Sequence, residues 1–195
     1  MISSFAIYNK CRQHFREESF MKRRSCAFTG HRPEKFPWKD DETDSQCIAL
    51  KAVLIAQIAE LAGSGVTDFL SGMARGVDTW TALAVLALRD KNPKIKLRCI
   101  LPDTTQANQW SDSEQETYHQ ILKQADSIVY VSRESHRNSM MDRNRFMADH
   151  ADVLLAVCSN IDERRGGTAA TVRYAKKVGK KIILLDPITL SVTYS

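Results

Sequence analysis

The sequence lacks cysteines spaced as zinc ligands or disulfide partners usually are. There are five in 195 residues: Cys11, Cys26, Cys47, Cys99 and Cys158. Their number is odd and no two form a C-x-x-C pair, which argues against a disulfide framework or a structural zinc site. An H-E-x-x-H motif and any cluster of cysteine and histidine are also missing, so we expect no metal site.

A long apolar run and a recognisable leader are missing too. No run approaches the roughly 20 residues that a membrane-spanning helix needs. The first 22 residues contain neither an apolar segment of signal-peptide length nor a small-residue cleavage pattern. We therefore expect a cytoplasmic protein with no membrane partner. Residues 1–22 are predicted to be a weakly structured extension, with Met21 close enough to the first strand to serve as the start codon, and residues 23–195 a single domain.

The body of the chain lacks an excess of positive charge. The formal net charge is +5, but residues 1–24 hold six Lys and Arg against two Glu, and the remainder holds 22 Lys and Arg against 21 Asp and Glu. A globally basic protein attracts nucleic acid through its overall field. Here any argument for a polyanionic ligand must rest on where the charges lie.

What the sequence does contain is six short apolar runs rich in β-branched residues. They are residues 25–29, 66–70, 95–101, 127–131, 152–157 and 181–186. Apolar residues recur with helical spacing between them, over 47–63, 78–90, 110–125, 140–150 and 167–179. Strands that alternate with helices predict a doubly wound α/β fold, with a mostly parallel, six-stranded Rossmann-like sheet in a three-layer sandwich. We predict the strand order 3-2-1-4-5-6, with the switch point between strands 1 and 4.

Glycines and arginines gather where the predicted strands end, which is the edge at which this fold class binds ligands. The candidate ligand-binding residues are Thr29, Gly30, His31, Arg32, Ser71, Gly72, Met73, Arg75, Gly76, Asp78, Arg143, Arg145, Gly166, Gly167, Thr168 and Thr171. Arg164 and Arg165 directly precede the last glycine pair. Glycines allow close approach of backbone amides at helix starts to an anion, and arginine forks bind phosphate oxygens. The pattern therefore favours a phosphate-bearing ligand.

Several of these residues also have a purely structural interpretation. A glycine pair before a helix is often a loop requirement, and His31 is either a turn residue or an acid/base group. Asp78 either caps its helix or accepts a sugar hydroxyl. The sequence contains no G-x-x-x-x-G-K-[ST] loop and no G-x-G-x-x-G fingerprint. It is the conjunction of four such loops that points to a ligand.

Three segments carry a family resemblance. They are SGMARGVDTWTA (71–82), DRNRFMADHADVLLAV (142–157) and RRGGTAATVRYAKKVGKKI (164–182). In order and spacing they resemble the Rossmann-type domain of the DprA proteins and, more broadly, the SLOG superfamily, which also includes the LOG phosphoribohydrolases and the YpsA family. The T-G-H-R-P segment at 29–33 and the short chain are closest to the small YpsA-like proteins, over roughly residues 22–186.

The resemblance implies three functions. The first is binding of a nucleotide or nucleotide derivative of the ADP-ribose or NAD type in a sensing or regulatory role, with no further cofactor. The second is binding of single-stranded DNA, for which Trp38, Trp110 and Tyr118 are candidate stacking residues. The third is hydrolysis of an N-glycosidic bond with His31 as the acid/base group, but LOG enzymes use a glutamate where this chain has Arg173. Related domains often dimerise, so a homodimer is also expected.

Overall fold

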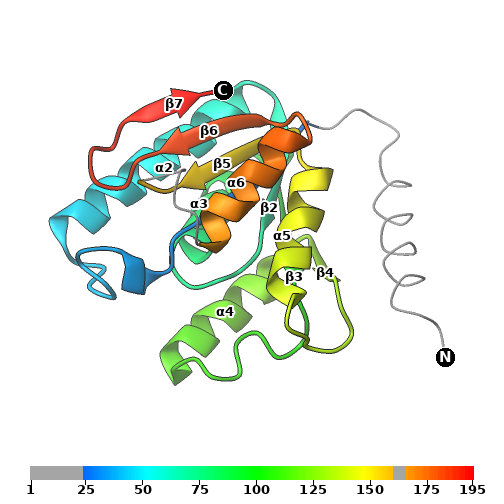
Figure 1. The fold of residues 1–195 in the computed structure, drawn as a ribbon. Helices are drawn as coiled ribbons and strands as arrows, with labels where there is room; N and C mark the ends of the chain where they lie inside the picture. Colours follow the sequence, from blue (N-terminus) through cyan, green and yellow to red (C-terminus); the bar gives the residue numbers. More distant parts are fainter. Residues whose placement is uncertain (1–23, 160–165) are drawn as a thin grey trace.

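A seven-stranded sheet lies between two layers of helices in the computed structural model, which describes residues 24–159 and 166–195 (Figure 1). The strands are β1 (Arg24–Gly30), β2 (Val66–Ser71), β3 (Lys96–Leu101), β4 (Ser127–Tyr130), β5 (Val153–Val157), β6 (Lys181–Leu185) and β7 (Val192–Tyr194). The helices are η1 (Pro33–Lys35), α2 (Ser45–Gly63), α3 (Val77–Arg89), α4 (Asp112–Gln124), α5 (Ser139–His150) and α6 (Gly167–Lys177). The predicted extension 1–22 and the arginines Arg164 and Arg165 lie outside the described residues.

The order of strands across the sheet is β4-β3-β2-β1-β5-β6-β7. Strands β1 to β6 are parallel, and β7 runs antiparallel to β6. The predicted fold class is confirmed, as are the five predicted helices. The predicted order 3-2-1-4-5-6 is wrong, because the fourth strand lies at the outer edge beside β3 and the fifth lies beside β1. The switch point is therefore between β1 and β5.

Burial explains the corrected order. Strand β4 is an edge strand in which Ile128 and Tyr130 remain 41% and 40% exposed, whereas every residue of β5 is buried. A strand that is apolar throughout can be covered on both faces, so β5 can lie in the centre of the sheet. The seventh strand was not predicted because it has only three residues and little apolar surface to bury.

Two cores cover the two faces of the sheet. Helices α2, α3 and α4 pack on one face, and α5 and α6 on the other (Figure 1). Side chains alternate along β1, so Cys26 and Phe28 enter the first core while Ala27 enters the second. Both helix layers are thereby fixed against the same central strand, at whose carboxyl end the predicted site lies.

Helix α2 begins at a side-chain cap, where Asp44 Oδ1 accepts a hydrogen bond of 2.7 Å from the Gln46 N–H. It buries Cys47, Leu50, Leu54, Ile58 and Leu61 along one side. Among the described helices it is the one that is long and apolar enough, by length and composition, to cross a membrane. Its five buried side chains are what a core helix beside a sheet requires.

Candidate functional site

A cavity of about 310 Å³ lies at the switch point, between the carboxyl ends of the central strands and the starts of three helices. We call it the switch-point cavity. Its lining residues are Thr29, Gly30, His31, Arg32, Glu34, Lys35, Ala74, Asp78, Met140, Arg143, Asn144, Gly166, Gly167 and Thr168. The structure thus brings together residues from β1, the β2–α3 loop, α5 and the start of α6. Four segments far apart in the sequence meet at one edge of the sheet.

Two glycines allow the first two of these segments to meet. A Cβ atom on Gly30 would lie 2.5 Å from the Cβ of Val77, so the end of β1 can touch the start of α3 only without a side chain. Gly76, which has a φ of 81°, precedes α3, and a Cβ there would lie 3.0 Å from the His31 carbonyl oxygen. The two glycines therefore allow the end of β1 and the residues after it to pack closely against the start of α3.

A buried ion pair forms the floor of the cavity. Arg143 Nη1 on α5 lies 3.4 Å from Asp78 Oδ2 on α3, and the two residues are only 4% and 6% exposed. Gly72 makes room for this pair, because a Cβ at position 72 would overlap the Arg143 guanidinium and lie 2.8 Å from Asp78 Oδ2. The charged pair therefore requires a glycine at position 72.

Burial dominates the electrostatics of this pair. It raises the pKa of Asp78, against the opposing effects of Arg143, the Ala74 N–H and Arg32. Burial likewise lowers the pKa of Arg143, and the charge of Asp78 opposes that change. Arg143 Nε has no hydrogen-bond partner among the described residues, and Nη2 contacts only the Met140 sulfur, at 3.9 Å. A guanidinium has five N–H donors, so several donors of this cavity-lining arginine have no partner among the described residues.

The β2–α3 loop is held by its own hydrogen bonds. Ser71 Oγ donates to the Asp78 carbonyl oxygen at 2.8 Å and accepts from the Met73 N–H at 3.1 Å. The Ala74 N–H donates to Asp78 Oδ2 at 3.2 Å. Met73 has a positive φ of 56° and a fully buried side chain. Ser71 and Met73 therefore shape the loop and do not line the cavity.

Helix α6 presents its first turn to the cavity. Gly166 precedes the helix with a φ of 145°, and no side chain caps it. Thr171 Oγ1 donates to the Gly167 carbonyl oxygen at 2.8 Å and accepts from Asn144 Nδ2 at 2.9 Å. Thr171 thus joins α5 to α6. Gly167 and Thr168 bring the start of α6 to the cavity, and the first amides of a helix, which have no partner within the helix, can bind anions.

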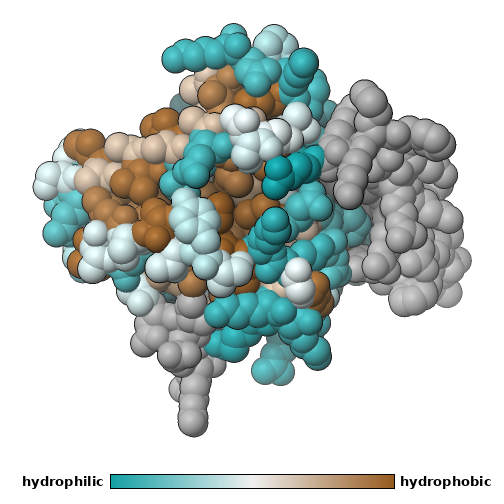
Figure 2. Space-filling model, turned by 90° about the horizontal axis from the view of Figure 1, so that it is seen from above, coloured by the Kyte–Doolittle hydropathy of each residue, from teal (hydrophilic) through white to brown (hydrophobic). Residues whose placement is uncertain are grey.

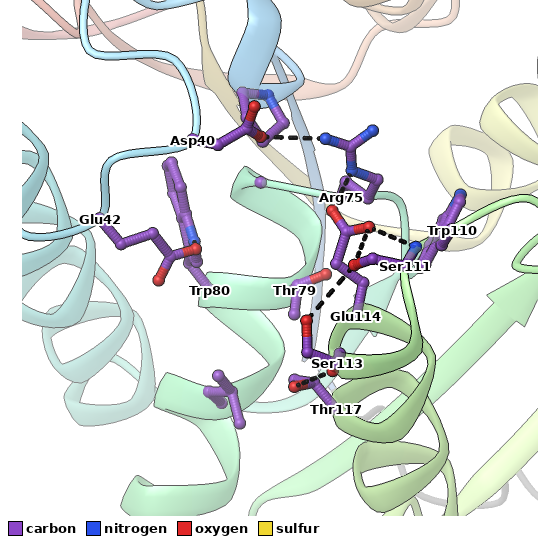
Figure 3. Close-up of a pocket in the computed structure, with 13 residues that line it drawn as sticks. Asp40, Glu42, Arg75, Thr79, Trp80, Trp110, Ser111, Ser113, Glu114 and Thr117 are labelled. Carbon is purple, nitrogen blue, oxygen red and sulfur yellow. Dashed lines mark hydrogen bonds and ion pairs between the residues drawn. The ribbon is translucent and has the colours of Figure 1, made fainter.

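Arg75 points away from this cavity into a second one of about 510 Å³ between α3 and α4 (Figure 3). It forms ion pairs with Glu34 at 2.8 Å, Asp40 at 3.0 Å and Glu114 at 2.5 Å. Partial burial alone lowers the pKa of Arg75, but the three carboxylates outweigh it and raise the pKa. Since its charge is already matched by three carboxylates, Arg75 holds the 33–44 segment against α4.

Other residues predicted from the sequence lie outside the switch-point cavity. Arg145 is exposed on α5, 3.8 Å from Asp142, with its guanidinium over the Tyr174 ring. Trp38 and Tyr118 are 7% and 6% exposed and belong to the core, so they offer no face for base stacking. Trp110 packs edge-on against Tyr118 and lines the second cavity.

Sequence reasoning missed Glu34, Lys35, Ala74, Met140 and Asn144 as lining residues. A helical signal was available for two of them. Positions 143 and 144 follow position 140 by three and four residues and so share its face of α5, whereas position 145 is turned about 140° away from 140. Had that spacing been applied, it would have favoured Met140 and Asn144 over Arg145.

The sequence is similar to a described family and to proteins of two Bacillus species. A family model named YpsA and described as the YspA SLOG family matches residues 26–190. A UPF0398 protein of Bacillus cereus strain AH820 is 29% identical over 157 residues, which are 79% of this chain and 83% of that protein. A UPF0398 protein of Bacillus pumilus strain SAFR-032 is 33% identical over 134 residues, covering 67% and 71%.

One solved structure shares the fold. DNA processing protein A from Helicobacter pylori, described for its single-stranded DNA binding mode, superposes with a TM-score of 0.56 at 19% identity. The match covers 83% of this chain and 65% of that one. At this level of identity the similarity concerns the fold alone.

Proposed function

Because the chain belongs to the YpsA SLOG family, we propose that its switch-point cavity binds a phosphate-bearing nucleotide or nucleotide derivative, of the ADP-ribose or NAD type, in a sensing or regulatory role. The observation that carries the proposal is Arg143. It is a buried arginine that lines the cavity and holds Asp78 through one long contact of 3.4 Å. Burying a guanidinium is costly unless its donors are paired, and phosphate oxygens pair with them in the fork geometry.

Three further groups support the same ligand class. The first turn of α6 at Gly167 and Thr168 offers backbone amides and the positive end of a helix dipole. Arg32 and Lys35 lie at the rim and add positive charge. Asp78 Oδ2 accepts from Arg143 Nη1 and from the Ala74 N–H at 3.2 Å. The other carboxylate oxygen, Oδ1, can accept a hydrogen bond from a sugar hydroxyl. These groups support a ligand that carries both phosphate and ribose.

Isothermal titration with AMP, ADP, ADP-ribose and NAD tests the proposal. We expect binding of at least one of these, and its loss in Arg143→Gln. The matched control is Arg145→Gln, which changes the neighbouring arginine on the exposed face of α5 and should bind as the wild type does. Arg143→Lys keeps the charge without the fork, so it should bind weakly while remaining folded. No binding by folded wild-type protein to any of the four would overturn the proposal.

Single-stranded DNA is the second candidate ligand, favoured by the fold shared with the Helicobacter protein and by Arg32 and Lys35 at the rim. Binding driven by phosphate contacts weakens steeply as salt rises. A fluorescent oligonucleotide titrated at several salt concentrations distinguishes the two candidates. An affinity for the oligonucleotide that falls steeply with salt concentration and depends on Arg32 favours DNA as the ligand. Weak binding whose affinity does not change with salt concentration excludes DNA.

The same nucleotide samples test hydrolysis of an N-glycosidic bond. His31 lines the cavity, as a group that donates or accepts a proton at the bond must. Chromatography of the incubated nucleotides reports any free base. Base release that disappears in His31→Ala would add a catalytic role, and its absence over long incubation leaves binding alone.

A further inference from the structure

The outer face of α2 exposes large apolar side chains to solvent. Ile48 and Ile55 are 54% and 56% exposed, and Ala52 and Ala59 are exposed on the same side of the helix. We call these four residues the α2 outer face. Seen from above, apolar side chains gather on the left of the molecule, the side on which α2 lies (Figure 2). A contiguous row of exposed apolar side chains on one helix face is a candidate interaction site.

Spacing shows what kind of surface this is. Positions 48, 52, 55 and 59 follow one another by four, three and four residues, which is the a/d repeat of a coiled coil. The residues buried in the core lie on another side of α2. Lys51 and Glu60 lie on the two flanks of the outer face and interrupt the apolar surface there. The repeat therefore forms a narrow seam of the width that a second helix covers.

We propose that the α2 outer face binds a second copy of this chain, with the two α2 helices packed antiparallel about a twofold axis. The large and small residues alternate so that this arrangement matches them. Ile48 meets Ala59 of the second copy, and Ala52 meets its Ile55. Every layer then combines one isoleucine with one alanine. A parallel pair would set isoleucine against isoleucine and alanine against alanine, which gives unequal spacing along the seam.

Charge at the ends of α2 favours the same orientation. Arg24 Nη1 donates to the Ser64 carbonyl oxygen at 2.7 Å, so a positive charge lies at the carboxyl end of the helix. Asp41 and Asp44 lie at its amino end. An antiparallel pair brings Arg24 of one copy toward these carboxylates of the other. It also makes the two helix dipoles run in opposite directions, which is favourable. A twofold interface makes both contacts twice.

Sedimentation velocity over a concentration series tests the proposal on the full chain. We expect a dimer for the wild type and its loss in Ile55→Glu, which places two carboxylates in the central layers of the seam. Ile128→Glu is the matched control, since Ile128 is 41% exposed on the edge strand β4 and is distant from α2 in the sheet order. Both variants should fold, since positions 55 and 128 are exposed in the monomer, and circular dichroism checks this.

Cysteine cross-linking tests the orientation, in a Cys11→Ser background because the other four cysteines are buried. A mixture of Ala52→Cys and Ile55→Cys chains should form a mixed disulfide, since the antiparallel seam places these positions opposite each other. Preferred cross-linking of Ala52→Cys with itself would overturn the antiparallel arrangement. A wild type that stays monomeric at all concentrations, or one that is monomeric and binds lipid vesicles through α2, would overturn the proposal altogether.

Discussion

Gly72 lies directly against the buried charged pair of the switch-point cavity. Its φ is ordinary, but a Cβ there would overlap the Arg143 guanidinium. We therefore expect Gly72→Ala to push Arg143 away from Asp78, to lower the free energy of unfolding by about 1–3 kcal/mol as overpacked sites do, and to abolish nucleotide binding. Urea unfolding and isothermal titration measure the two effects.

The control for this change is Gly63→Ala at the end of α2, where no atom lies within 4 Å of the added Cβ. That variant should retain wild-type ligand affinity. Unaltered binding in Gly72→Ala would show that the Arg143–Asp78 contact can be displaced without consequence, and would remove the main argument for Arg143 as the phosphate ligand.

Asp78 compensates the charge of Arg143 in the absence of ligand. Removal of one partner from a buried ion pair leaves the other uncompensated, so we expect Asp78→Asn to lower the free energy of unfolding by about 3 kcal/mol. Double substitution with Arg143→Met should restore part of that loss, because no buried charge is left unpaired. Urea unfolding of the four chains forms a double-mutant cycle. Additive losses would mean that the two side chains do not interact.

The arginines show where reasoning from the sequence reaches its limit. Glycine and arginine after four of the strands predicted that these loops meet at one edge of the sheet, and residues from them line one cavity there. The sequence does not say where a long side chain points. Arg75 follows the same strand as Gly72, yet it turns to Glu34, Asp40 and Glu114, two of which lie on a segment that has no strand pattern.

At the scale of elements, Asp126 ties three of them together just before β4. Its carboxylate accepts from Lys96 Nζ at 2.9 Å, the Leu97 N–H at 2.9 Å and Arg89 Nη1 at 3.1 Å. Burial alone would raise the pKa of Asp126, but these donors outweigh it and the pKa is lowered. Since the folded-state pKa lies below the unfolded value of about 3.9, the contribution to stability is present above that value and is lost as pH falls through the folded-state pKa.

We therefore expect Asp126→Asn to cost stability at neutral pH and progressively less as the solution is acidified. Asp103 and Glu114 also have lowered pKa values, so the wild type loses stability from several groups in the same range, and the difference between the two chains isolates Asp126. Thermal unfolding followed from neutral pH to below pH 3 gives this difference. A gap between the curves that stays constant with pH would contradict the assignment.

The order of the strands could not be derived from periodicity alone. The runs at 127–131 and 152–157 are both apolar, and both predict a strand correctly. Which of them lies beside β1 depends on where the connection through α5 crosses the sheet, and a local pattern does not record that. Burial separates them afterwards, because Ile128 and Tyr130 tolerate solvent at an edge while β5 has no exposed side chain.

At the scale of the whole molecule, the switch-point cavity joins the two halves of the sheet. Its lining comes from β1 and the β2–α3 loop on one side and from α5 and the start of α6 on the other. A ligand that contacts both halves binds the folded state and not the unfolded one. It should raise the free energy of unfolding by about 2.7 kcal/mol at a concentration of 100 times the dissociation constant.

Hydrogen exchange with and without the nucleotide that binds in titration locates this stabilisation. We expect slower exchange in the 71–78 loop and at the start of α6 together, because one phosphate-bearing ligand has to contact both. In Gly72→Ala neither segment should respond. Protection confined to the second cavity, at Trp110 and the start of α4, would contradict the switch-point assignment. It would place the ligand against Arg75 and its three carboxylates, which form a surface that repels phosphate.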